Sequence, residues 1–354
     1  MIPQYEPSYS PKGYQFVQQA LLENRLGPGI YCDQFEQALK DKYGFKHVIL
    51  VNSGTSAIMV AMRAMLGEGK NKVLAPSYTF LAGHNAARFL GYDVDLIDIG
   101  DNLVVNSLRL HSKLRKQSYD LLLYVNHNAY NIGTMIADIK HQCVERGMLM
   151  IEDSSQCINV PYSNILGYCG TLGDCGILSF SVPKLLTTGQ GGAIITADDE
   201  IADKCRRLVD HGGGKWRQNR VHEEIGVNLR MPDLTAAYGL GQLEEIDKRY
   251  ALRAKIHQRY KDLLGDAYIS EAHSWMCIYR NTKERTEFII ERLEQNGIIA
   301  KQYYLPIHWN QSFNTCGDHF PGAEKAWREL IYLPSSLNLT QEQIYRISTI
   351  INEI

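Results

Sequence analysis

Apolar and polar residues follow two alternating patterns between about residues 45 and 200. Short apolar runs are typical of buried strands, and stretches with apolar residues at helical spacing separate them. Strands are predicted at residues 47–51, 72–75, 95–98, 121–125, 148–151 and 191–196. Strands that alternate with helices are typical of a mainly parallel sheet with helices on both faces, so this part of the chain predicts an α/β fold.

The pattern changes after residue 235. Between residues 235 and 264, apolar residues keep an approximate helical stripe among many charges, which predicts a long amphipathic connector followed by a smaller α/β domain. A chain of 354 residues is long enough for about two domains. We therefore predict a large domain at residues 1–245 and a small C-terminal domain at residues 246–354.

A candidate anion site follows the strand at residues 47–51. The run stops at Asn52-Ser53-Gly54-Thr55-Ser56-Ala57, where a helix is predicted to begin with Ser53 or Thr55 as its cap. Backbone N–H groups and hydroxyls at a helix N-terminus can bind a phosphate. The sequence matches neither a Walker loop nor the dinucleotide fingerprint. A well-capped helix without a ligand is the alternative interpretation.

Two ionisable residues follow later strands. Asp153 comes after the strand at 148–151, at the edge where open α/β sheets bind ligands, and could pair with a protonated pyridine nitrogen, cap a helix or bind a metal. No His/Cys ligand spacing lies near it, which disfavours the metal. Lys184 lies between apolar residues 177–180 and a Gly/Thr-rich loop, so we expect burial to lower its pKa. Such a lysine can form a Schiff base, although a surface lysine beside a turn would show the same local pattern.

Motifs along nearly the whole chain resemble, in order, those of the DegT/DnrJ/EryC1/StrS family of sugar aminotransferases. They lie at residues 52–57, 76–80, 152–156, 179–192, 226–231 and 305–308. The resemblance implies a pyridoxal 5'-phosphate (PLP) enzyme of aminotransferase fold type I. It also implies a large domain with a mainly parallel mixed sheet flanked by helices, plus a smaller C-terminal α/β domain. Residues 2–8 also resemble the start of members that aminate GDP- or dTDP-linked 4-keto sugars.

The resemblance also implies roles for single residues. Lys184 would hold PLP covalently and act as the acid/base, and Asp153 would pair with the pyridine nitrogen. Gln156 would contact the hydroxyl side of the ring, and Phe80 would stack on it. The remaining matches are to positions that bind the cofactor phosphate, namely Gly54, Thr55, Ser179 and, from a partner subunit, Asn228. Each active site would then lie at the interface of a homodimer, and a monomer would be inactive.

Several of these residues have a second interpretation. Phe80 could be a core residue, and Asn228 could only shape its turn. His308 could contact substrate or be a buried, hydrogen-bonded histidine. Lys215 belongs to a basic, glycine-rich stretch that could close over a nucleotide diphosphate or be a plain flexible loop. Substrate roles for His308 and Lys215 are therefore hypotheses.

The chain departs from the family pattern at two places. Residues 127–132 lack the usual glycine, so the local turn is not predicted. Gln190 stands where glutamate is usual, which removes a charge beside the lysine loop. Neither change touches a cofactor residue, so the prediction of the cofactor is better supported than the prediction of the substrate.

Composition restricts the remaining classes of function. A formal net charge of −2 gives no electrostatic basis for binding nucleic acid or an anionic membrane. The eight cysteines contain no CxxC pair, and no apolar run suggests a signal peptide or membrane span. We therefore predict reduced thiols and a cytoplasmic protein.

The predicted reaction is a transamination in amino-sugar biosynthesis. By resemblance, the donor is an amino acid, L-glutamate, and the acceptor a nucleotide-linked 4-keto-6-deoxyhexose. A 3-keto sugar or a keto-cyclitol remains an alternative acceptor. A PLP-dependent sugar dehydratase is a second alternative, but relatives with colitose-type chemistry carry histidine at the lysine position. A noncatalytic PLP-binding regulator is the third, and such regulators usually carry a DNA-binding module for which this length leaves no room.

Overall fold

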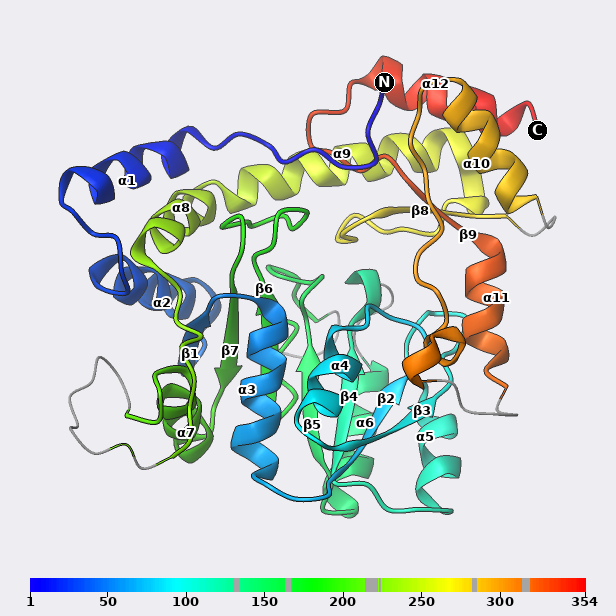
Figure 1. Cartoon of the computed structure of the whole chain (residues 1–354). Helices are drawn as coiled ribbons and strands as arrows, with labels where there is room; N and C mark the ends of the chain where they lie inside the picture. Colours follow the sequence, from blue (N-terminus) through cyan, green and yellow to red (C-terminus); the bar gives the residue numbers. More distant parts are fainter. Residues whose placement is uncertain (130–133, 163–166, 214–221, 223, 282–284, 314–318) are drawn as a thin grey trace.

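The structure, a computed structural model, describes residues 1–129, 134–162, 167–213, 222, 224–281, 285–313 and 319–354. Its large sheet has seven strands in the order β1-β7-β6-β5-β4-β2-β3 (Figure 1). The strands are β1 (His47–Val51), β2 (Lys72–Pro76), β3 (Asp93–Ile97), β4 (Leu121–Val125), β5 (Leu149–Asp153), β6 (Cys175–Ser179) and β7 (Gly192–Thr196). Strand β7 runs antiparallel to β1 and β6, and the other pairs are parallel. The predicted mainly parallel, mixed sheet is confirmed.

Helices cover both faces of this sheet. They are α1 (Pro11–Leu22), α2 (Ile30–Tyr43), α3 (Gly54–Leu66), α4 (Ala82–Phe89), α5 (Ser107–Leu114), α6 (Thr134–Glu145), α7 (Asp199–Val209) and α8 (Asp233–Glu244). Because side chains alternate along a strand, Leu121 and Leu123 pack in the core with α3, α4 and α7. Leu122 packs on the opposite face with α5 and α6. This two-sided burial explains why the strands read as continuous apolar runs.

The C-terminal part of the chain forms a second layer beyond one end of the sheet (Figure 1). It contains α9 (Ile246–Leu264), α10 (Thr286–Gln295), α11 (Pro321–Glu329), α12 (Gln341–Asn352) and an antiparallel pair of strands, β8 (Cys277–Arg280) and β9 (Leu330–Leu333). Its hydrophobic core includes Ile2, which forms a parallel bridge with Ile298. The start of the chain is therefore part of this C-terminal layer.

The prediction of one long connector at residues 235–264 is wrong in one respect. Two helices, α8 and α9, occupy this stretch and are separated at Glu245, whose φ and ψ are −96° and 0°. Helix α8 is buried on nearly all sides because α1 and α2 pack against it. At Gly241, an added Cβ would lie 2.2 Å from the backbone nitrogen of Gly13, so the close approach of α1 requires glycine there. Only α9 keeps the predicted amphipathic stripe.

Candidate active site

A cavity of about 570 Å³ lies where the carboxyl ends of β5 and β6 meet the C-terminal layer. Most of the predicted cofactor residues line it, namely Gly54, Thr55, Phe80, Asp153, Gln156, Ser179 and Lys184. They lie at residues 54–55, 80, 153–156 and 179–184, which are far apart in the sequence. Parallel strands whose carboxyl ends share one edge explain why these residues meet.

The N-terminus of α3 forms one wall of this cavity. Ser53 caps the helix, since its hydroxyl accepts a hydrogen bond from the backbone N–H of Ser56 at 3.0 Å. At Gly54, an added Cβ would lie 3.0 Å from the Cβ of Ser179. Glycine therefore leaves backbone N–H groups of the first helical turn open beside the hydroxyls of Thr55 and Ser179. This cradle fits the phosphate of PLP.

Lys184 follows β6 on a short turn in which its backbone N–H donates to the carbonyl of Ser181 at 3.0 Å. The side chain is buried, and its Nζ lies 3.6 Å from the centroid of the Trp275 ring. Burial lowers the pKa of Lys184 to about 8, although the Asp153 carboxylate acts in the opposite direction. A substantial fraction of this amine is neutral near pH 8, as a nucleophile that forms a Schiff base requires.

Asp153 is the last residue of β5 and faces the cavity. Its Oδ1 accepts a hydrogen bond from the backbone N–H of Ser155 at 3.0 Å. Burial raises the pKa of Asp153 above its usual range, and hydrogen bonds from Ser155 and the charge on Lys184 counteract this effect. A partly buried carboxylate with remaining acceptor capacity fits the protonated pyridine nitrogen of PLP.

Gln156 is held between two neighbours. Its Oε1 accepts from the backbone N–H of Asn128 at 2.6 Å, and its Nε2 lies 3.4 Å from the hydroxyl of Tyr304. Asn128 and Ala129 have φ values of 53° and 55°, so the chain turns here without the glycine that the family usually has. The rest of the altered stretch, from residue 130 to 132, lies outside the described residues.

Phe80 is 63% exposed even though the residues before it are buried. Its interpretation as a core residue is therefore wrong. The ring lines the cavity and meets the ring of Tyr304 edge-on, with centroids 6.2 Å apart. An aromatic face left open to a cavity fits the stacking role that the family resemblance implies.

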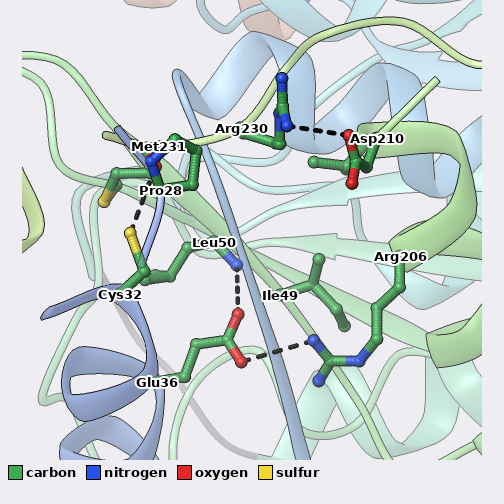
Figure 2. Close-up of a pocket in the computed structure, with 10 residues that line it drawn as sticks. Pro28, Cys32, Glu36, Ile49, Leu50, Arg206, Asp210, Arg230 and Met231 are labelled. Atoms are coloured by element: carbon green, nitrogen blue, oxygen red, sulfur yellow. Dashed lines mark hydrogen bonds and ion pairs between the residues drawn. The ribbon is translucent and has the colours of Figure 1, made fainter. Parts of the chain in front are cut away.

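Asn228 does not line this cavity. It is exposed, and its Oδ1 accepts from the Nε of Arg230 at 2.9 Å. Arg230 also lines a cavity of about 50 Å³ in which ion pairs join Arg230 to Asp210 at 3.0 Å and Arg206 to Glu36 at 3.4 Å (Figure 2). The two cavities share no lining residue. Contact of Asn228 with a partner subunit's cofactor stays a prediction.

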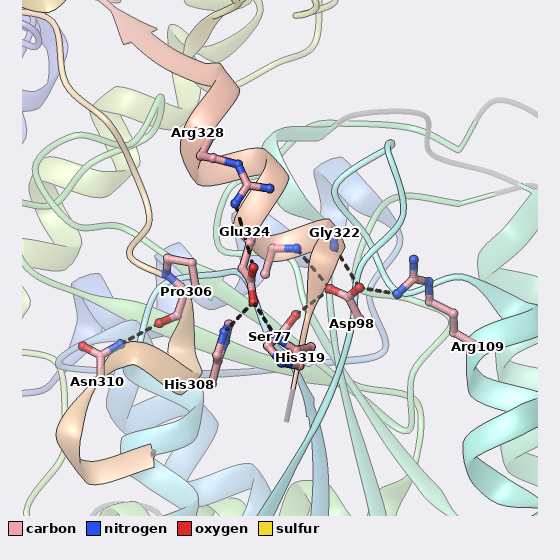
Figure 3. A network of polar contacts seen from close by, with 11 residues as sticks. Ser77, Asp98, Arg109, Pro306, His308, Asn310, His319, Gly322, Glu324 and Arg328 are labelled. Atoms are coloured by element: carbon pink, nitrogen blue, oxygen red, sulfur yellow. Dashed lines mark hydrogen bonds and ion pairs between the residues drawn. The ribbon is translucent and has the colours of Figure 1, made fainter. Parts of the chain in front are cut away.

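His308 is buried against α11 and is not among the residues that line the large cavity (Figure 3). Its Nε2 lies 3.2 Å from Oε1 of Glu324, and its ring centroid lies 4.8 Å from that of Phe320. These contacts match the interpretation as a buried, hydrogen-bonded histidine. Asn310, two residues later, does line the cavity. Lys215 lies outside the described residues.

The cavity also has aromatic residues that sequence reasoning did not select. They are Tyr5, Trp275, Tyr303, Tyr304 and Tyr332. The chain has 21 tyrosines, so residue type alone does not distinguish these. Tyr303 and Tyr304 directly precede the motif at residues 305–308, and that adjacency was the signal available in the sequence.

The described ranges contain neither a candidate metal centre nor a helix that could span a membrane. Among those residues, no group of three or more His, Cys, Asp or Glu side chains is arranged to hold a metal ion. None of the helices in the described part of the chain combines the length and apolarity needed to cross a membrane.

Comparisons with known proteins place this geometry in a family. The model of the DegT/DnrJ/EryC1/StrS aminotransferase family matches residues 9–352. GDP-perosamine synthase from Escherichia coli O157:H7 is 28% identical over 99% of this chain and 98% of its own. PseC from Helicobacter pylori, an aminotransferase involved in the biosynthesis of pseudoaminic acid, has a TM-score of 0.90 at 24% identity, covering 99% of this chain and 98% of its own.

A third relative was solved with a cofactor. NtdA from Bacillus subtilis, with bound PMP, has a TM-score of 0.85 at 22% identity, covering 96% of this chain and 81% of its own. The cradle at α3, Asp153 and Lys184 fit PLP, the cofactor of this family. The chain belongs to the DegT/DnrJ/EryC1/StrS aminotransferase family and is a PLP-dependent aminotransferase.

Proposed function

We propose that the protein transfers an amino group from L-glutamate to a nucleotide-linked 4-keto-6-deoxyhexose in amino-sugar biosynthesis. The observation that carries this proposal is one cavity that contains a buried lysine, a partly buried aspartate and the N-terminus of α3. PLP, when bound, supplies an electron sink for the carbon that gains or loses the amino group. Both substrates would use the cavity in turn.

Each residue has a separate task in this proposal. The Nζ of Lys184 would hold the cofactor and, when it is free, would take a proton from the donor carbon that bears the amino group. The same Nζ returns a proton when the keto sugar is aminated. Asp153 keeps the ring nitrogen protonated, and Phe80 fixes the plane of the ring. Tyr303 and Tyr304 narrow the cavity and exclude water from Nζ.

The cavity wall supports a sugar as the acceptor. Asp153 and Lys184 are the charged residues among the described ones that line it, and most of the others are aromatic, hydroxylic or amide side chains. Gln190 lines the same wall, so the wall lacks the negative charge that the usual glutamate would add. A wall of this kind suits a sugar that carries an anionic nucleotide. A relative that is 28% identical is named dTDP-4-dehydro-2,3,6-trideoxy-D-glucose 4-aminotransferase, and that name favours a 4-keto substrate.

Lys184 also separates the proposal from the other reactions. A dehydratase of the colitose type would have histidine in place of Lys184, which lies in the cavity. A noncatalytic PLP-binding regulator does not require a lysine whose pKa is lowered to about 8 beside a carboxylate. A 3-keto sugar and a keto-cyclitol remain alternative acceptors, which an amino-transfer assay can distinguish from the 4-keto sugar.

We also propose a homodimer with shared active sites. Large apolar side chains are exposed along the N-terminal segment and near Asn228, namely Tyr9, Tyr14, Leu21, Leu22, Leu26, Ile30, Ile225 and Val227. Apolar surface of this extent suits burial against a second copy of the chain. Asn228, exposed on the same chain, would then reach a cavity that is not its own. The seven described cysteines are free and buried, which supports the cytoplasm as the site of the reaction.

The test combines trapping of the cofactor with an amino-transfer assay. Borohydride reduction followed by peptide mapping should place the cofactor on Lys184. Lys184→Ala should bind PLP noncovalently and transfer no amino group from glutamate to GDP- or dTDP-4-keto-6-deoxyhexose. Lys255→Ala, at an exposed position on α9, is the matched control and should keep full activity. Normal turnover by Lys184→Ala would refute the mechanism, and amination of only a 3-keto sugar or a keto-cyclitol would refute the substrate.

A further inference from the structure

We propose that Trp275 is a positioning residue that holds the unlinked amine of Lys184 against its ring and keeps it directed into the cavity. This inference rests on the proposed role of Lys184. Trp275 lies just before β8, in the C-terminal layer, whereas Lys184 follows β6 of the large sheet. The contact therefore joins two parts of the chain that the sequence separates.

The geometry is that of a close cation–π contact. The Nζ of Lys184 lies 3.6 Å from the centroid of the Trp275 ring, well within the roughly 6 Å range of such contacts. Lys184 is buried, and the attraction is stronger where water is excluded. The other ionisable groups that act on Lys184, or on which it acts, are Asp153, Cys157 and His127. Asp153 and Cys157 both raise the pKa of Lys184, and Trp275 adds an uncharged source of stabilisation for the ammonium.

The ring of Trp275 is fixed to the lysine turn. Its Nε1 donates a hydrogen bond to the carbonyl of Pro183, the residue before Lys184, at 2.6 Å. Its own carbonyl accepts from the buried guanidinium of Arg253 at 2.5 Å. Next to it, the backbone N–H of Met276 donates to Oδ1 of Asn128 at 2.7 Å. Trp275 is thus anchored from α9, from the turn after β4 and from the lysine turn itself.

Trp275 also lines two cavities. Trp275 and Lys184 both line the cavity of about 570 Å³ and a second one of about 20 Å³ that Arg253 lines. The smaller space is large enough for about one water. With a smaller side chain at position 275, the neutral amine could turn toward that space, where the Nε and Nη2 groups of Arg253 have no hydrogen-bond partner. The indole therefore restricts Lys184 to the side on which the cofactor binds.

The experiment compares Trp275→Leu, Trp275→Phe and Trp309→Leu. Trp309 is 43% exposed and does not line the cavity, so its variant is the matched control. In the apoenzyme, competitive acetylation with peptide mapping gives the pKa of Lys184 without any turnover. Loss of the ring in Trp275→Leu should lower that pKa by about one unit, or ~1.4 kcal/mol. Trp275→Phe should keep most of the pKa but lose the bond to Pro183.

Kinetics of the holoenzyme then test positioning. Trp275→Leu should lower kcat roughly tenfold or more, because a misplaced catalytic group costs rate, with KM for glutamate little changed. Trp275→Phe should fall between Trp275→Leu and the native enzyme. An unchanged pKa and kcat in Trp275→Leu would overturn the proposal, and a raised pKa would mean that the ring only excludes water.

Two controls keep these outcomes interpretable. Circular dichroism and thermal unfolding check each fold, and Trp275→Met replaces the leucine variant if that one does not fold. Failure of borohydride to trap cofactor on Lys184 in the native protein would refute the proposed function instead. The acetylation series would still report on the contact between Trp275 and Lys184.

Discussion

Glu152 and Asp153 are consecutive residues of β5, yet their carboxylates lie in opposite kinds of surroundings. Glu152 is fully buried, and its oxygens accept from six groups at 2.5–3.4 Å, namely Asn126 Nδ2, the Tyr162 and Ser154 hydroxyls and the backbone N–H groups of Gly170, Leu172 and Gly173. Asp153, on the other face of the sheet, accepts from Ser155 and borders the cavity. A carboxylate therefore stabilises the fold at Glu152 and is available for the proposed reaction at Asp153.

The difference lies in how much hydrogen-bonding capacity remains. A carboxylate offers about four acceptor sites, and the donors around Glu152 occupy them. They fasten the loop before β6 to β5. Asp153 keeps capacity for a ligand, and burial without full compensation raises its pKa. A saturated buried acid is expected to matter for stability, and an unsaturated one for function.

Asp153→Asn should have the largest effect in this comparison. The amide is nearly the same size but cannot hold a protonated ring nitrogen by charge, so kcat should fall about 10²–10³-fold, as when one electrostatic partner is removed from a catalytic site. Thermal unfolding of the apoenzyme should change little. Steady-state kinetics and calorimetry on one preparation give both values. A variant that unfolds readily but turns over normally would reverse the assignment of the two acids.

Glu152→Gln should show the opposite behaviour. Its new NH₂ group would face N–H donors in the interior, so the free energy of unfolding should fall by about 3 kcal/mol. At temperatures where the variant is folded, kcat should stay near the native value. Denaturant titration measures the loss, and Glu291→Gln, at an exposed site on α10, is the control. A stability equal to that of the control would mean that the donors around Glu152 contribute little.

The pH dependence of cofactor capture is the smallest of the three effects. The pKa of Lys184 is lowered to about 8, so the neutral amine increases as the pH rises through that value. The rate at which the apoenzyme captures PLP should rise about fivefold from pH 7 to pH 8, rise about twofold more by pH 9 and then level off. Because the Asp153 carboxylate raises this pKa, Asp153→Asn should move the midpoint to lower pH, while Glu152→Gln should leave it in place. Stopped-flow absorbance resolves the midpoints, and equal midpoints in both variants would contradict the coupling.

Much of the fold could be predicted because both faces of the sheet are buried. The strands at residues 47–51 and 121–125 match β1 and β4, and the other predicted strands differ only at their ends. The break between α8 and α9 was missed because apolar residues continue across Glu245. Contacts from α1 and α2, which single-sequence periodicity does not report, decide where α8 ends. The domain boundary after residue 245 stays a prediction.

The site residues also divide into those that the sequence could predict and those that it could not. Gly54, Asp153 and Lys184 could be selected because each lies at or after the end of a strand that the sequence marks. Trp275 and Tyr304 could not, because they reach the cavity through the packing of the C-terminal layer on the sheet. His308 belongs to a recognised motif, yet its side chain turns toward α11, a choice that the motif does not encode.

The bridge between Ile2 and Ile298 has a consequence for how the protein is made. The backbone of Ile2 bonds to Gly297 and Ile299, and Ser335 donates to the carbonyl of Gln4. Residues 2–4 therefore cannot settle until the segments around residues 297–299 and 335 have been synthesised. Tyr5, which lines the cavity, is next to these residues and can settle only with them. During synthesis, the cavity is therefore complete only when these two segments meet.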